Sequence, residues 1–180
     1  MPQPAHQSIA ERHEHNALIE LIQRLERYIA PIGASEPDWY DWIPLSMTTY
    51  LDGMRAVRDR LGPGRRHYLE IGSGIGTKLI LAHALGYHAT GIEHHAPYVH
   101  VSRALAPHCP VIEGDAQHAF AIYPTADIIY NYGIAIDQEH HHQINQLIAD
   151  RMSPGALYFT PRHPQPDQLE PVAENVWIKP

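Results

Sequence analysis

Apolar residues in the first third of the chain recur at helical spacing. A first set lies between residues 16 and 30: Leu18, Leu21, Ile22, Leu25, Tyr28 and Ile29. A second set lies between residues 46 and 61: Met47, Tyr50, Leu51, Met54, Val57 and Leu61. Each set falls on one face of a helix, so the pattern predicts two amphipathic helices. Pro31 and Gly33 end the first, and the Gly-Pro-Gly run at 62–64 ends the second. We therefore predict a helical N-terminal extension over residues 1–62.

The pattern changes after residue 63, where short apolar runs alternate with longer amphipathic ones. Strands are predicted at 67–71, 89–93, 111–113, 127–132 and 156–160, with a last short strand at 175–179. Helices are predicted at 77–85, 97–105 and 138–152, with a weaker segment at 116–122. Strands that alternate with helices pair in parallel through right-handed crossovers. Residues 63–180 are thus predicted to form one α/β domain, an open and mostly parallel sheet with helices on both faces.

A glycine-rich turn follows the first predicted strand directly. The run GSGIG occupies residues 72–76, Glu70 stands two residues before it, and a helix begins at Thr77. Glycine allows a sharp turn and close approach of a ligand, and the helix N-terminus offers unpaired N–H groups. Dinucleotide-binding folds use G-x-G-x-x-G here, whereas this third glycine comes one residue early. From the loop alone, a glycine turn in another kind of α/β protein stays open as an alternative.

Acidic residues end the next two predicted strands. Glu93 comes roughly twenty residues after the loop, where a carboxylate accepts hydrogen bonds from ribose hydroxyls. The third strand leads into Glu113-Gly114-Asp115-Ala116, and an aspartate in such a turn can accept an exocyclic amine. In an open parallel sheet these strand ends lie together, so the sequence predicts a nucleoside-like ligand beside the glycine loop.

In this order, the motifs resemble those of the class I S-adenosylmethionine-dependent methyltransferases, which have a seven-strand, Rossmann-like sheet. The resemblance covers about residues 65–160 and implies that S-adenosylmethionine is the cofactor. It implies that the loop holds the methionine part of the cofactor and that the acidic turn contacts the adenine. By its position, His94 is predicted to lie at the ribose or adenine edge. The predicted cofactor-binding residues are Glu70, Gly72, Ser73, Gly74, Gly76, Glu93, His94, Gly114, Asp115, Ala116 and Asn131.

The end of the fourth strand bears on the methyl acceptor. Residues 130–133 read Tyr-Asn-Tyr-Gly, without the Asn/Asp-Pro-Pro-aromatic run of DNA amino methylases or the Pro-Cys of cytosine C5 enzymes. The segment resembles the seven-strand protein-lysine methyltransferases, which implies that Asn131 lies beside the reacting amine. Asn131 and Tyr132 are the predicted catalytic residues, and the acceptor is a small molecule or a protein side chain. Two alternatives stay open: a degenerate cofactor-binding module with an interaction role, and an NAD-dependent oxidoreductase.

Composition narrows the choice of partners and location. A net charge of −7 argues against nucleic acid, which attracts clustered cations. The single cysteine, Cys109, and the absence of a signal-like start or a membrane-length apolar run predict a cytoplasmic protein. The fifteen histidines lack metal-ligand spacing, so no metal site is predicted. Because only about twenty residues follow the fifth strand, we expect a shortened C-terminal sheet edge, through which copies of the chain could pair.

Overall fold

The computed structural model describes residues 16, 17, 19–21, 23, 24, 27, 47–62, 66–119, 121–132, 138–161 and 167–180. The chain divides into two units, Met1–Pro44 and Leu45–Pro180. In the first unit the described residues, all between 16 and 27, are helical. This agrees with the first predicted helix as far as the description extends.

The second unit is built on one seven-stranded sheet. Its strands are β1 (His67–Ile71), β2 (His88–Glu93), β3 (Val111–Glu113), β4 (Ile128–Asn131), β5 (Leu157–Phe159), β6 (Glu170–Ala173) and β7 (Val176–Ile178). They lie in the order β3-β2-β1-β4-β5-β7-β6. The first five are parallel, and β7 is antiparallel to both β5 and β6. Chain order reverses between β1 and β4, and ligands bind at such switch points in open α/β sheets.

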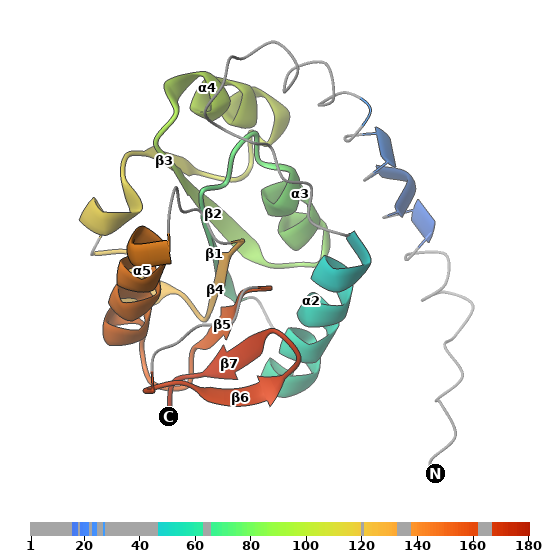
Figure 1. Ribbon diagram of the computed structural model, residues 1–180. Coiled ribbons are helices and arrows are strands. Elements are labelled where there is room, and N and C mark those ends of the chain that lie inside the picture. The colour runs from blue at the N-terminus through green and yellow to red at the C-terminus, as the bar shows by residue number, and fades with distance from the viewer. Residues whose placement is uncertain are drawn as a thin grey trace. The chain divides into compact units, whose positions relative to one another are not determined.

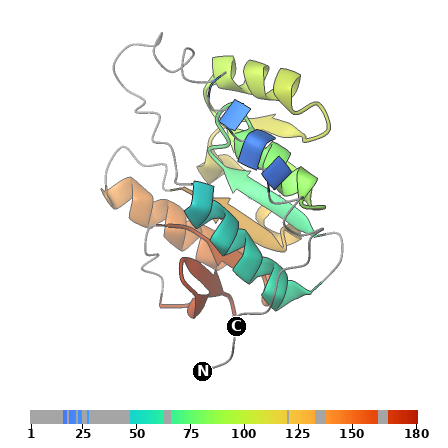
Figure 2. The same cartoon turned by 90° about the vertical axis from the view of Figure 1, so that its right-hand side faces the viewer.

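Helices cover both faces of this sheet. They are α2 (Met47–Leu61), α3 (Thr77–Ala84), α4 (Ala96–Leu105) and α5 (Gln138–Arg151), with 3₁₀ turns η1 (Ala116–His118) and η2 (Tyr123–Thr125). Figure 1 shows α2 and α3 on one side of the sheet and α5 on the other. Figure 2 turns the side with α2 and α3 toward the viewer. The Rossmann-like α/β architecture predicted from the sequence is confirmed.

The helix α2 packs against the sheet with the face that its sequence pattern predicts. Tyr50, Met54 and Val57 are buried, and the Tyr50 ring lies 5.8 Å from Phe159 and 5.3 Å from Tyr130, centroid to centroid. The sheet-bearing unit therefore begins before α2, whereas the sequence placed this helix in the N-terminal extension. Burial of its apolar stripe joins it to the sheet.

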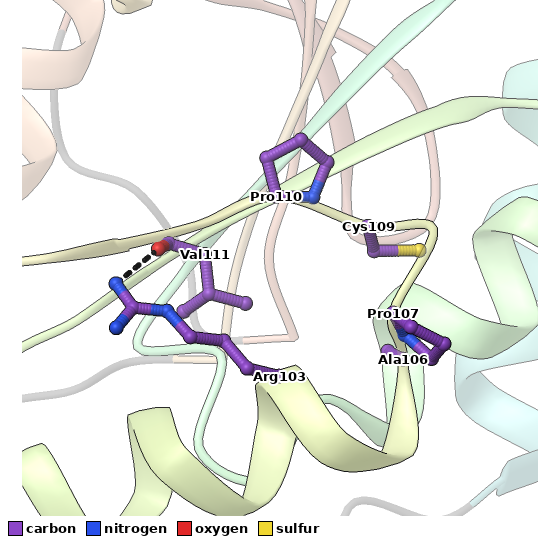
Figure 3. Close-up of a pocket in the computed structure, with 6 residues that line it drawn as sticks. All are labelled: Arg103, Ala106, Pro107, Cys109, Pro110 and Val111. Carbon is purple, nitrogen blue, oxygen red and sulfur yellow. Dashed lines mark hydrogen bonds between the residues drawn. The ribbon is translucent and has the colours of Figure 1, made fainter.

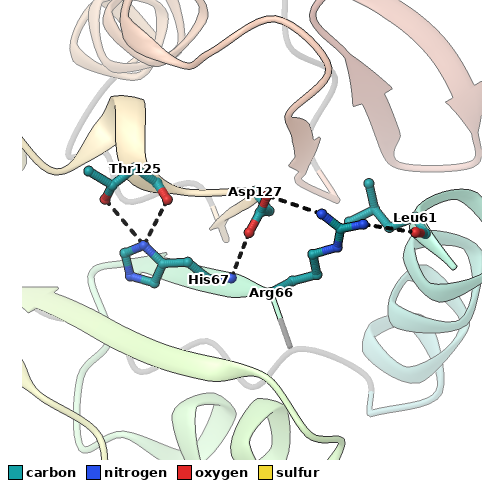
Figure 4. Close-up of polar contacts among 5 residues, drawn as sticks. All are labelled: Leu61, Arg66, His67, Thr125 and Asp127. Carbon is teal, nitrogen blue, oxygen red and sulfur yellow. Dashed lines mark hydrogen bonds and ion pairs between the residues drawn. The ribbon is translucent and has the colours of Figure 1, made fainter. Parts of the chain in front are cut away.

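Polar contacts join the amino ends of β1 and β4 (Figure 4). One Asp127 carboxylate oxygen accepts the His67 backbone N–H at 2.8 Å, and the other lies 3.7 Å from Arg66. Arg66 also donates to the Leu61 carbonyl at the end of α2. One His67 ring nitrogen lies 3.1 Å from the Thr125 carbonyl oxygen. These contacts stabilise the amino ends of the parallel strands, at the end of the sheet opposite the glycine turn.

The sequence predicts one short strand at the C-terminal edge of the sheet, and the structure has two. Both antiparallel strands are present, although β6 has four residues and β7 three. The shortening lies in the connection, since the described residues between β5 and β6 (160, 161 and 167–169) contain no helix. The sequence missed β6, because Glu170-Pro171-Val172-Ala173 lacks apolar alternation and contains a proline. A proline is tolerated on an edge strand, where its missing N–H opposes no partner.

Candidate functional site

The glycine turn has a backbone that requires glycine. Gly72, Gly74 and Gly76 have φ angles of 64°, 53° and 84°, in the left-handed region that other residues rarely adopt. A Cβ on Gly76 would lie 2.3 Å from the Ser102 hydroxyl oxygen on α4. The turn closes through a hydrogen bond from the Gly76 N–H to the Ser73 carbonyl at 2.9 Å, and α3 begins at Thr77. It therefore places a tight glycine turn, whose residues 73–76 are buried, at the carboxyl end of β1.

Gly91, a glycine inside β2, lets the turn lie close to that strand. A Cβ on Gly91 would lie 2.5 Å from the Ser73 hydroxyl oxygen and 2.9 Å from a Leu79 methyl carbon. The Ser73 N–H also donates to the Ile92 carbonyl at 3.0 Å. An isolated glycine inside a strand is the sequence signal for such close backbone approach.

Glu70 is a buried carboxyl beneath this turn. Its side chain is 5% exposed, and its Oε2 atom has no hydrogen-bond partner. Burial raises the pKa of Glu70 well above its ordinary value; nearby Lys78 lowers it, and nearby Glu93 raises it. Burial and then nearby Glu70 raise the pKa of Tyr130, whose hydroxyl likewise lacks a hydrogen-bond partner. A buried carboxyl oxygen without a hydrogen-bond partner is costly, and the Oε2 atom of Glu70 is such an oxygen.

The carboxylate of Glu93 binds backbone groups of the protein itself. One oxygen accepts the Gly74 N–H and the other the His95 N–H, each at 2.8 Å, and the residue is 5% exposed. The neighbouring His94 is exposed, and its Nδ1 lies 3.5 Å from a Glu93 oxygen. The structure thus joins Glu93 to the glycine turn and places His94 beside Glu93.

The acidic turn lies beside the end of β2. The Gly114 N–H donates to the Glu93 carbonyl at 2.9 Å, and the exposed Asp115 accepts the Gln117 N–H at 2.7 Å as the N-cap of η1. Ala116 is the first residue of that turn. The glycine turn, Glu93 and the acidic turn therefore lie next to one another at the carboxyl ends of β1, β2 and β3.

Asn131 lies at the end of β4 but inside the protein. It is wholly buried, and its amide nitrogen donates to the Tyr158 hydroxyl at 3.0 Å. Tyr158 in turn donates to Asn145 on α5, whose amide nitrogen lies 3.1 Å from a His141 ring nitrogen. Burial raises the pKa of Tyr158, and its hydrogen bonds to Asn131 and Thr160 lower it. Tyr132, the other predicted catalytic residue, is half-buried. The sequence alone gives no sign of this network.

A hollow of about 340 Å³ lies elsewhere, where α4 leads into β3 (Figure 3). Its lining is Arg103, Ala106, Pro107, Cys109, Pro110 and Val111. The Arg103 guanidinium donates to the Val111 carbonyl at 2.9 Å and lies 3.8 Å from Glu113. The hollow faces the amino end of β3, away from the glycine turn.

Within the described ranges, no group of three or more His, Cys, Asp or Glu could hold a metal ion. No helix in the same part of the chain is long and apolar enough to cross a membrane.

Solved structures share this architecture. CalS10, an amino pentose methyltransferase from Micromonospora echinaspora with S-adenosylmethionine bound, matches 93% of this chain and 61% of its own with a TM-score of 0.54 at 16% identity. The chain has the class I methyltransferase fold. A Geobacter sulfurreducens S-adenosylmethionine-dependent methyltransferase in complex with S-adenosylhomocysteine matches 74% of this chain and 54% of its own (TM-score 0.52, 20% identity).

The PH0226 protein from Pyrococcus horikoshii OT3 is also similar, over 74% of this chain and 64% of its own (TM-score 0.53, 14% identity). The chain thus spans between half and two thirds of the length of these structures. No family model and no curated protein matches it. These structures establish the fold of the chain and assign no role to its residues.

Proposed function

We propose that this protein binds S-adenosylmethionine at the carboxyl ends of β1, β2 and β3 and transfers its methyl group to a small molecule or a protein side chain. The observation that carries the proposal is a glycine turn bordered by two buried carboxyl groups, Glu70 and Glu93. Structural neighbours that are methyltransferases support the general kind of function.

Charge distinguishes this ligand from a dinucleotide. Pyrophosphate sites use free backbone N–H groups of the glycine loop, but here the Gly74 N–H already donates to Glu93. The Glu93 carboxylate would repel a pyrophosphate, whereas a bound cation would stabilise the charged form of the Glu70 carboxyl. S-adenosylmethionine carries a sulfonium and an ammonium group, so the residues of the turn fit it. NAD carries a pyrophosphate and fits the same residues poorly.

The proposed contacts follow from the placement of each group. The unpartnered Oε2 of Glu70 suits the ammonium of the methionine part, and the exposed Asp115 suits the adenine amine. Each Glu93 oxygen keeps a second lone pair for a ribose hydroxyl. The turn at Gly72, Ser73, Gly74 and Gly76, together with His94, Gly114 and Ala116, would surround the cofactor.

Little catalytic machinery is required for the transfer itself. S-adenosylmethionine supplies a methyl group on a sulfonium, whose carbon–sulfur bond breaks as the acceptor–carbon bond forms. The electron pair of the broken bond stays on sulfur, and a protonated acceptor loses its proton to a base or to solvent. Such a displacement depends chiefly on placing the acceptor in line with the methyl carbon. Glu70, Glu93 and the turn would hold the donor, and the acceptor stays a prediction.

The burial of Asn131 favours a second candidate, a cofactor-binding module without methyl transfer. Asn131 is 0% exposed and its amide donates to Tyr158, so in this arrangement it presents no group to an acceptor. Asn131 and Tyr132 accordingly stay predictions as catalytic residues, and Asn131 also as a cofactor contact. The pairing of copies through the C-terminal sheet edge and a cytoplasmic location are predictions as well.

Calorimetric titration with S-adenosylmethionine, S-adenosylhomocysteine and NAD tests the proposal. We expect the first two to bind and NAD not to bind. Glu70→Gln and Asp115→Asn should each weaken binding, whereas Asp52→Asn should not, because Asp52 is exposed on α2 and pairs with Arg55. NAD binding in preference to S-adenosylhomocysteine would contradict the proposal. A labelled-methyl screen of metabolite and protein extracts would then separate the enzyme from the module.

A further inference from the structure

Glu93 joins three segments that the sequence separates. Its carboxylate oxygens accept the Gly74 N–H of the glycine turn and the His95 N–H at the start of α4, each at 2.8 Å. Its carbonyl accepts the Gly114 N–H of the acidic turn at 2.9 Å. One residue at the end of β2 therefore binds the loop after β1, the helix after β2 and the turn after β3.

The side-chain contacts have the properties of strong hydrogen bonds. Both are short, both end on a carboxylate, and the residue is only 5% exposed. His95 is the N-cap of α4, and its own side chain caps no amide of that helix. Gly74 is buried, so its backbone N–H requires a hydrogen-bond partner. All these contacts join groups of the protein itself.

We propose that Glu93 is a positioning residue, whose carboxylate holds the glycine turn and the start of α4 in the ligand-binding arrangement before any ligand arrives. The inference rests on the proposed function only for the identity of the ligand, S-adenosylmethionine or S-adenosylhomocysteine. Pre-ordering of this kind raises affinity because the ligand does not have to order the loop. This role is distinct from a direct contact with the ribose, since it acts in the free protein.

Glu93→Gln is the sharpest test, because the amide keeps the size and shape of the carboxyl. Glutamine offers one acceptor oxygen and places an NH₂ donor where the second backbone N–H needs an acceptor. At least one of the Gly74 and His95 amides must then lose its partner. Glu170→Gln is the matched control: it removes the same charge from an exposed residue of β6, at the other edge of the sheet.

Hydrogen exchange of the ligand-free protein, followed by NMR, gives the readout. We expect the Gly74 amide, the His95 amide or both to exchange about tenfold faster or more in Glu93→Gln, while the buried Ile129 amide is unchanged. The control should match the wild type at all three amides. A general loss of stability would accelerate Ile129 as well, so that residue separates local from global effects. If Glu93→Gln leaves Gly74 and His95 as protected as in the wild type, the proposal is overturned.

Affinity for S-adenosylhomocysteine supplies the second readout. We expect Glu93→Gln to weaken binding about tenfold or more and Glu170→Gln to leave it within about twofold. Faster exchange with unchanged affinity would overturn the claim that binding depends on the pre-ordered loop. If the wild type does not bind S-adenosylhomocysteine at all, the proposed function fails, and the exchange experiment still decides whether Glu93 orders the loop.

Discussion

Gly53 lies where α2 packs against β5, and its replacement by alanine gives a clear test of this packing. A Cβ there would lie 2.2, 2.4 and 2.9 Å from three carbons of the Phe159 ring. Carbon atoms in contact normally lie about 3.5–4.0 Å apart. The ring is wholly buried and lies 4.9 Å from Tyr130 and 5.8 Å from Tyr50, between centroids, so it has little room to move.

Two opposing effects set the size of the change. Alanine in place of glycine inside a helix stabilises by about 1 kcal/mol through helix propensity. Overpacking of a filled core costs about 1–3 kcal/mol, and an overlap of more than an ångström places Gly53→Ala at the upper end of that range. We therefore expect a net loss of about 2 kcal/mol, which lowers the melting temperature of a chain this size by roughly 4–8 °C.

Urea unfolding followed by circular dichroism measures this change, and Phe159→Leu supplies the control. The smaller side chain removes the ring carbons that the new methyl would meet. In the Phe159→Leu background, Gly53→Ala should therefore cost much less or even stabilise, which gives a coupling energy between the two sites. If Gly53→Ala alone raises the unfolding midpoint, as it would at an open helical position, the packing of α2 described above is wrong.

Three further outcomes are expected. Because burial raises the pKa of Glu70, the folded state binds its proton more tightly than the unfolded state, so stability should fall as pH rises above the ordinary carboxyl value. Urea midpoints from about pH 4 to pH 8 should fall less steeply for Glu70→Gln, and equal slopes would contradict this. In Gly91→Ala the new Cβ would displace Ser73, so the loss in free energy of S-adenosylhomocysteine binding, measured by calorimetry, should exceed the loss in free energy of unfolding. Unchanged affinity would argue against a site at this turn. Tyr158→Phe removes the buried hydroxyl that accepts from Asn131 and donates to Asn145, so it should cost about 1–3 kcal/mol in urea unfolding, and a loss under about 0.5 kcal/mol would show that this hydroxyl contributes little.

Most of the fold could be predicted because its elements have strong periodic patterns. The bounds of β1 and β3 agree with the prediction, those of β4 and β5 differ by one residue at each end, and that of β2 differs by one residue at its start. Helices α2, α3, α4 and α5 lie where the apolar spacing places them. The strand β6 could not be predicted, because its four exposed residues carry no alternation and it forms only by pairing with β7.

The candidate site could be located because its residues follow strands. Parallel strands bring their carboxyl ends to one edge, so Glu70, the glycine turn, Glu93 and the acidic turn converge whatever the details of packing. Their order along the chain was sufficient to predict that these residues lie together, and the ligand stays a proposal. The same reasoning placed Asn131 at this edge, but position along a strand does not determine which face of the sheet a side chain enters or what it meets there.

By itself, the sequence determined the strand and helix order, the parallel sheet and the glycine turn, since these depend on local periodicity and on where glycine can adopt a left-handed backbone. Only the tertiary structure decided the partners of the polar groups. Glu93 pairs with Gly74 and His95, the amide of Asn131 pairs with Tyr158, and Glu70 keeps an oxygen without a partner. Hydrogen bonds and burial arise between segments that are distant in the chain, and their geometry is set when those segments pack.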